Sequence, residues 1–153
     1  MQLRETGADD EVTGYPGGMS TWDPLLDRLT QLRDSWPAPP WTWDGRFAAI
    51  ASSFAADQEP VVRASAMLAF PRGWTIKSLE TAPPEMLALA ERTGGLRAGQ
   101  RILGGDPVTS PNLFGLWWPW GGGAKITLRI GLLDIAADAE PLPRIRELFG
   151  VKA

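Results

Sequence analysis

The chain has 153 residues, of which 44% are hydrophobic and 22% are charged, and its net charge at pH 7 is -3. These values predict one globular domain with its own core, and the negative charge gives no electrostatic footprint for nucleic acid. The sequence contains no cysteine and no histidine, which excludes disulfides, thiolate nucleophiles, imidazole bases, Ser-His-Asp triads and the usual zinc sites. We therefore expect no cofactor and favour a role without catalysis, because histidine is the usual acid-base group near neutral pH.

The N-terminal sequence, MQLRETGADDEV, is charged and lacks the apolar region of a secretory signal. No apolar run approaches the roughly 18 residues that a spanning helix needs. These features predict a cytoplasmic protein without a membrane partner, and the abundance of Ala, Gly, Pro and Arg is typical of a GC-rich bacterial genome. Residues 1–19 are rich in glycine and acidic side chains and predict a flexible tail, so that residues 20–153 form the single globular domain.

The first helix is expected from Ser20 to Trp36. Apolar side chains recur there at helical spacing, and Pro37, Pro39 and Pro40 end the helix. The apolar stripe consists of Trp22, Leu25, Leu26, Leu29, Leu32 and Trp36.

A second helix is expected from Asp44, as its cap, to about Asp57. Trp41 and Trp43 precede it and share a face if the chain there is extended, where they would form a sugar-stacking pair. The alternative, which we favour, is that they fill the joint between helix and sheet. The buried side of this helix is expected to carry Phe47, Ile50, Ala51 and Phe54.

Residues 61–70 and 74–80 predict the two strands of a hairpin, because apolar and polar side chains alternate along both. Pro71 and Gly73 occupy positions that are typical of a tight turn between them.

A third helix follows, capped by Thr81 and ended by Gly94 or Gly95. Residues 100–103 predict a short strand, and the glycines and prolines after it predict a loop over residues 104–111.

Residues 112–134 have the clearest pattern in the chain and predict two strands joined by an aromatic, glycine-rich connection. A short last helix is expected to begin at Pro141 or Pro143 and to end before Gly150. Along the second of the two strands, polar or small residues alternate with Ile126, Leu128, Ile130 and Leu132.

The predicted order is helix, helix, strand, strand, helix, three strands and a last helix. This order predicts an α+β fold in which a mostly antiparallel sheet of about five strands packs against helices. From Asp44 onward the order is similar to that of roadblock-type adaptor domains, a resemblance that implies a dimerising scaffold. A profilin-like or GAF-like layout fits almost as well.

A tryptophan cluster lies just before three consecutive glycines. Trp117 and Trp118 are adjacent, so their side chains point to opposite faces of a strand. At least one of Trp117, Trp118 and Trp120 is therefore expected on the less buried side or at the tip, where tryptophan is typical of a partner contact. The alternative is that helices cover both faces and bury all three. We predict a contact surface for a protein partner at this loop, extended to Trp41 and Trp43.

Four cations, Arg63, Lys77, Lys125 and Arg129, fall on the polar registers of the predicted strands. Pairing of those strands would gather them on one face, which could bind an anion or an acidic partner. The alternative, which we favour, is that they are solubilising charges on an open or edge strand.

Two carboxylates are candidates for a polar contact, an acid-base pair or metal ligation. Asp106 stands in a Gly-Gly-Asp-Pro loop and Asp134 follows the most regular strand. An aspartate before proline is also an ordinary turn former, which is the alternative that we favour.

Together these features predict a non-enzymatic protein-interaction or adaptor module that binds a protein partner or a second copy of itself. Three alternatives stay open: a small-ligand or carbohydrate binding domain, an immunity or antitoxin-like inhibitor, and a carboxylate-dependent hydrolase.

Overall fold

The computed structural model describes residues 22–38, 40–135 and 139–152. The predicted tail over residues 1–19 and the predicted helix start at Ser20 lie outside the described residues.

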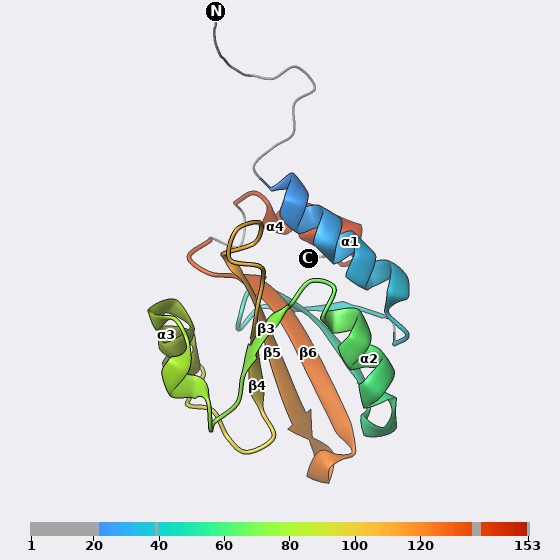
Figure 1. Cartoon of the computed structure of the whole chain (residues 1–153). Helices are drawn as coiled ribbons and strands as arrows, with labels where there is room; N and C mark the ends of the chain where they lie inside the picture. Colours follow the sequence, from blue (N-terminus) through green and yellow to red (C-terminus); the bar gives the residue numbers. More distant parts are fainter. Residues whose placement is uncertain (1–21, 39, 136–138, 153) are drawn as a thin grey trace, which may run out of the picture.

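A six-stranded antiparallel sheet forms the centre of the fold, with the strands in the order β1-β2-β6-β5-β4-β3. The α+β class with a mostly antiparallel sheet is therefore confirmed, with six strands where about five were predicted. Figure 1 shows the sheet between two groups of helices. The strands are β1 (Thr42–Asp44), β2 (Ala49–Ala55), β3 (Arg72–Trp74), β4 (Arg101–Gly104), β5 (Leu113–Trp120) and β6 (Lys125–Leu132).

β5 and β6 pair along their whole length, and the connection between them is short, as predicted. Leu128 and Ile130 on β6 are fully buried, in agreement with the alternating pattern. The polar register of β6 is covered more than the pattern predicts, since Thr127 is only 7% exposed. The reason is that β6 lies in the middle of the sheet, between β2 and β5, where neighbouring side chains cover both faces.

Three helices, α1 (Asp23–Ser35), α2 (Glu59–Ala66) and α4 (Leu142–Leu148), pack on one face of the sheet. Their buried side chains, among them Leu29, Val62 and Ile145, form the main core with β2, β5 and β6. No helix in the described part of the chain has both the length and the apolar character needed to cross a bilayer.

The other face carries α3 (Pro84–Arg92), which packs Met86 against Ile102 and Leu116 in a smaller second core. Short 3-10 helices complete the fold: η1 (Ala56–Gln58), η2 (Leu79–Thr81) and η3 (Gly121–Gly123).

The predicted second helix is wrong, because its residues form the hairpin of β1 and β2. Asp44 caps no helix; its carboxylate accepts a hydrogen bond from the backbone N–H of Arg46 (3.1 Å) in the turn between the strands. Ala48 has a φ of 49°, outside the helical region. Ile50 and Phe54 misled the prediction, because a spacing of four residues fits one face of a helix and one face of a strand equally well.

The predicted strand over residues 61–70 is also wrong, because α2 and the turn after it occupy this segment. Pro60 lies in the first turn of α2, where its missing N–H leaves no helical hydrogen bond unmade. Val62 and Ala66 are both buried here, and they are again four residues apart. Because a spacing of four residues fits both structures, the prediction assigned a helix where β2 lies and a strand where α2 lies.

The predicted turn over residues 71–73 is replaced by strand β3, which pairs with β4 and not with the preceding segment. Of the predicted strand over residues 74–80, only Trp74 belongs to the sheet, and the chain then turns into η2. The other helices and strands, α1, α3, β4, β5, β6 and α4, lie within a few residues of their predicted positions.

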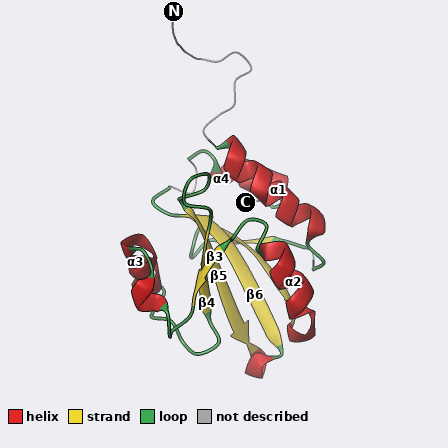
Figure 2. Ribbon diagram, viewed as in Figure 1, coloured by secondary structure: helices red, strands yellow, loops and turns green. Residues whose placement is uncertain are grey.

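The helices on the two faces are offset from each other (Figure 2). α1, α2 and α4 pack mainly over β2, β6 and β5, whereas α3 packs over β4 and β5. Each face of the sheet therefore has a covered part and a less covered part. The less covered parts are a hollow beside β1, β2 and β6 on one face and a cleft beside β3 and β4 on the other.

Replacing Gly131 of β6 by alanine is expected to lower the free energy of unfolding by about 1–3 kcal/mol. A Cβ atom at this position would lie 2.5 Å from Cζ of Phe114, whose side chain is 3% exposed and has little room to move. Urea unfolding followed by tryptophan fluorescence measures the change. Gly45→Ala is the matched control, because a Cβ there meets nothing closer than 3.7 Å. Equal stability of the two variants would contradict the close packing inferred for Phe114.

Candidate functional site

The sheet surface that α3 leaves uncovered contains a shallow hollow of about 550 Å³. It lies over β1, β2, β6 and the end of β5. We call it the open sheet face and define it by six side chains: Asp44, Ser53, Trp118, Trp120, Thr127 and Arg129.

Strand register brings these side chains to one surface. Ser53 on β2 lies opposite Thr127 on β6, which in turn lies opposite Trp118 on β5. Arg129 and Trp120 are two residues away from Thr127 and Trp118 along their own strands, so they point to the same face. The open sheet face is thus a direct consequence of the antiparallel pairing of four strands, with Asp44 supplied by β1.

An ion pair between Asp44 and Arg129 lies at one side of the open sheet face. Arg129 Nε donates to Asp44 Oδ2 at 2.7 Å, and the two side chains are only 14% and 15% exposed. Arg46, which is largely exposed, donates to the same carboxylate at 3.2 Å. Burial alone would raise the pKa of Asp44, but the hydrogen bonds from Arg46 and Arg129 outweigh it and lower the pKa to about 2.

Aromatic rings hold the guanidinium of Arg129 from the other side. Its Cζ lies 5.1 Å from the ring centroid of Trp118 and 5.7 Å from that of Phe47. These two rings meet edge to face, with centroids 5.5 Å apart. The indole Nε1 of Trp118 is buried and has no hydrogen-bond partner among the residues that the structure describes. Such an unsatisfied donor costs about 1–3 kcal/mol.

Trp120 is the exposed aromatic side chain of the open sheet face, with 51% of its surface accessible. Its indole N–H donates to the hydroxyl of Thr127 at 2.8 Å. The Thr127 hydroxyl is also 2.7 Å from that of Ser53. The ring is therefore held by its polar edge while much of its apolar surface faces solvent.

The other predicted contact tryptophans lie in or against the main core. Trp117 and Trp41 are 3% and 8% exposed. Trp43 is partly buried against the same core, and the guanidinium of Arg146 lies 4.5 Å from its ring centroid. Trp117 and Trp41 have almost no exposed surface for a partner, whereas Trp43, Trp118 and Trp120 line the hollow.

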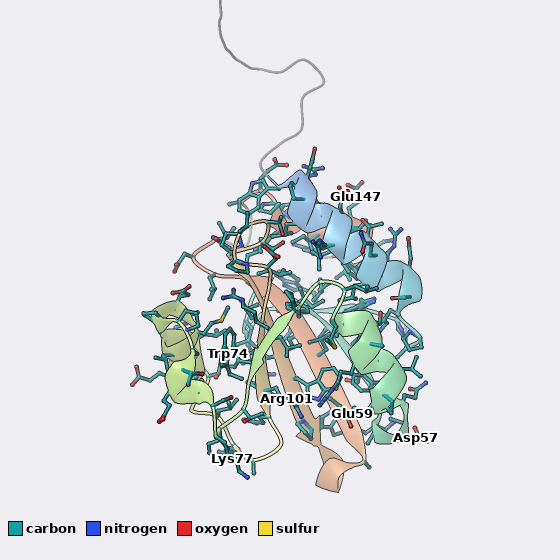
Figure 3. All side chains as sticks on the ribbon, viewed as in Figure 1. Asp57, Glu59, Trp74, Lys77, Arg101 and Glu147 are labelled. Carbon is teal, nitrogen blue, oxygen red and sulfur yellow. The ribbon has the colours of Figure 1, made fainter. Side chains whose placement is uncertain are left out.

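The four predicted cations do not share one face, which corrects that expectation. Arg63 lies on α2, on the opposite side of the sheet, where it pairs with Glu59 at 3.0 Å. Lys77 lies in the turn beyond β3, as Figure 3 shows. Lys125 and Arg129 do share a register on β6, but Lys125 is exposed at the start of the strand. The prediction failed because residues 63 and 77 belong to no strand.

Asp106 acts as a turn former. Its Oδ1 accepts the backbone N–H groups of Val108 (2.8 Å) and Thr109 (3.1 Å). The hydrogen bonds from Thr109 and Val108 hold the pKa of Asp106 below its usual value. Asp134 is exposed after β6. Within the described ranges, no cluster of three or more potential metal-ligating side chains is present.

Comparison of the chain with protein-family models, with curated proteins and with solved structures finds no match. A function must therefore be argued from the geometry of the chain itself.

Sequence reasoning missed Asp44, Ser53 and Thr127 as parts of the site. The signal that could have found Asp44 is the Asp-Gly pair at 44–45, which is typical of hairpin turns between strands. With β2 assigned as a strand, Ser53 follows on the face opposite the buried Phe54.

The ion pair of Asp44 predicts a loss of stability in acid. A pKa lowered from 3.8 to about 2 means that the folded state favours the carboxylate. Its contribution, on the order of 1–2 kcal/mol, is complete above about pH 4 and disappears as the pH falls toward 2. The free energy of unfolding of Asp44→Asn should therefore lie below that of the wild type at pH 6 and approach it near pH 2.

Urea unfolding between pH 2 and 7 measures this difference. Asp27→Asn, at an exposed position on α1, is the matched control and should show no such convergence. A difference between Asp44→Asn and the wild type that stays constant down to pH 2 would contradict the prediction.

Proposed function

We propose that the protein is a non-enzymatic interaction module that binds a protein partner through the open sheet face. The observation that carries this proposal is the half-exposed ring of Trp120, held by its hydrogen bond to Thr127 beside a compensated ion pair.

Trp120 has the properties of a binding hot spot. A partner that covers its ring removes a large apolar surface from water, and tryptophan is enriched among the residues that dominate interface energies. Because the indole N–H already bonds Thr127 at 2.8 Å, the ring loses less side-chain entropy on binding than a freely rotating one.

The charges beside Trp120 give the surface specificity. Asp44 and Arg129 are paired with each other at 2.7 Å, so a partner meets no isolated buried charge, which would be costly to cover. Polar groups of the partner that match this pair would favour one orientation of docking over others.

The first partner to consider is a second copy of the chain. The adaptor-like order of elements predicted from the sequence does not support it, because residues 49–55 form strand β2 and residues 59–66 form helix α2. A relationship to roadblock-type, profilin-like or GAF-like proteins is a proposal that rests on the antiparallel sheet and its flanking helices alone. An immunity or antitoxin-like inhibitor is another form of the same proposal, in which the partner is a toxic enzyme. For a carboxylate-dependent hydrolase we find no supporting observation, because Asp106 is engaged in its own turn.

Truncation of Trp120 is expected to weaken association without unfolding the domain. For a homodimer, Trp120→Ala should raise the dissociation constant by at least about 30-fold, the loss of a hot spot of about 2 kcal/mol. Light scattering coupled to gel filtration over a concentration series measures this change, and thermal unfolding checks that the fold is kept. Val108→Ala is the matched control, since this side chain is 86% exposed on the loop between β4 and β5. A wild-type chain that stays monomeric throughout contradicts the homodimer form.

A partner other than a second copy needs a different measurement. A photo-crosslinking residue in place of Trp120, tested in cells that express the protein, should give a discrete adduct that the same residue at Val108 does not. Adducts in neither case, or equal adducts in both, would argue against the open sheet face as an interface.

A carbohydrate or other small polar ligand is the second candidate, favoured by the polar hollow that indole rings help to line. Hydroxyls of Thr42, Ser53 and Thr127 line it beside Trp118 and Trp120, a combination typical of ring stacking with hydrogen bonds at the rim. A tryptophan fluorescence shift with a glycan or nucleotide panel, lost in Trp120→Ala, would support this candidate. No response across the panel would weaken it.

A further inference from the structure

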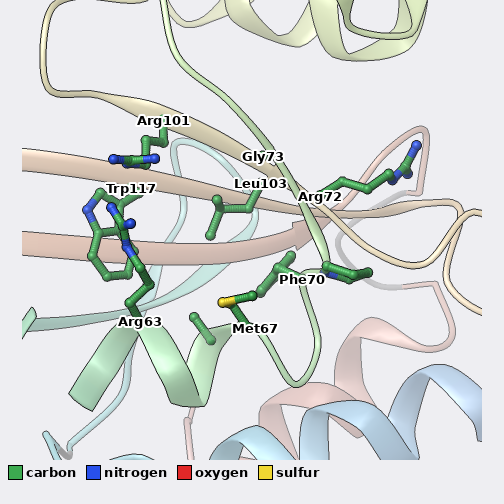
Figure 4. Close-up of a pocket in the computed structure, with 10 residues that line it drawn as sticks. Arg63, Met67, Phe70, Arg72, Gly73, Arg101, Leu103 and Trp117 are labelled. Atoms are coloured by element: carbon green, nitrogen blue, oxygen red, sulfur yellow. The ribbon is translucent and has the colours of Figure 1, made fainter. Parts of the chain in front are cut away.

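A second concave site lies on the opposite face of the sheet, between α2 and strands β3 and β4 (Figure 4). Its volume is about 200 Å³. It exists because α2 packs over β5 and β6 and leaves the neighbouring strands less covered. The side chains that matter are Arg63, Met67, Phe70, Arg101 and Trp117.

Two arginine side chains, Arg63 and Arg101, lie at this cleft in a protein whose net charge is -3. Arg63 is balanced by Glu59 at 3.0 Å. Arg72 borders the cleft, but its side chain turns to the α3 face, where Nε donates to the carbonyl oxygen of Gly105 at 2.9 Å and the guanidinium lies 5.4 Å from the ring centroid of Trp74. Arg101 has no hydrogen bond or ion pair with any residue that the structure describes. The cleft therefore carries a net positive charge and one guanidinium that is free to bind.

The base of the cleft is apolar. Phe70 and Trp117 are each 3% exposed and present their rings as part of the main core. Met67 on the rim is 59% exposed, and its unbranched thioether can adapt to the shape of a bound group. Figure 4 shows the Arg63 and Arg101 side chains converging beside Trp117, whereas the Arg72 side chain points away from them.

We propose that this cleft binds a small amphipathic carboxylate, with its apolar body on Met67 and Phe70 and its carboxylate on Arg101. A guanidinium suits this role because it can donate two parallel hydrogen bonds to a carboxylate. The volume is below the roughly 300–1,000 Å³ of pockets for drug-sized ligands, so the ligand is a small acid. The site lies on the other face from Trp120, so its success or failure is independent of the protein interface proposed above.

Methionine methyl groups report on this cleft selectively. The chain has four methionines, of which Met67 lines the cleft and Met86 is fully buried in the second core. In protein labelled with ¹³C at the methionine methyls, octanoate should shift the Met67 signal in a saturable way and leave that of Met86 unchanged. Octanamide, which has the same chain without the charge, should bind at least about tenfold more weakly, as expected for loss of a charge-assisted hydrogen bond.

Variants separate the role of Arg101 from that of general positive charge. Arg101→Gln should weaken octanoate binding at least tenfold, whereas Arg97→Gln, at an exposed position outside the cleft, should leave it unchanged. Any of three results would overturn the proposal. These are no Met67 shift at millimolar octanoate, equal binding of octanamide and octanoate, and equal weakening of octanoate binding by both variants. A shift of Met67 by inorganic phosphate alone would overturn the requirement for an apolar body.

Discussion

The pairing of β5 with β6 is the constraint on which the rest of the molecule depends. The register runs without interruption from Leu113 opposite Leu132 to Trp120 opposite Lys125. Because side chains alternate along a strand, this register sends Trp117 into the main core and Trp118 to the opposite surface. A shift of one residue would exchange the two faces of the sheet. The assignment of side chains to the main core and to the open sheet face follows from this alignment, whereas the cleft also needs α2, β3 and β4.

The offset of the helices decides which parts of that alignment reach the solvent. Three helices share one face, and α3 is alone on the other, over β4 and β5. A sheet of six strands is wider than either group covers. The uncovered part of one face keeps polar and aromatic side chains around Thr127, and that of the other keeps arginines around an apolar base. Both candidate sites therefore lie where the sheet extends beyond the helices that cover it.

The sequence predicted helices and strands correctly where the spacing of apolar residues fits only one of the two structures. The alternation from Ile126 to Leu132 identified β6, and the leucines of α1 identified a helix. It was insufficient where buried residues lay four apart, as at Ile50 and Phe54, because helix and strand both place such residues on one side. That ambiguity hid Asp44 as a partner of Arg129, which comes from a strand far along the chain. Trp120 could be predicted as a contact residue because its position at the end of an aromatic strand can be read from neighbouring residues. The arginine cleft could not be predicted, because it forms only where α2, β3 and β4 come into contact.

The tip that joins β5 to β6 beside Trp120 has backbone angles that L-residues rarely adopt. Gly121, Gly122 and Gly123 have φ values of 62°, 69° and 91°, and a Cβ on any of them would meet nothing within 4 Å. L-residues avoid such angles because of their own backbone and Cβ atoms, not because of neighbours. A residue of the opposite hand adopts such positive φ angles without that clash. A synthetic chain with D-alanine at position 122 would keep the tip geometry, with fewer unfolded conformations than glycine allows.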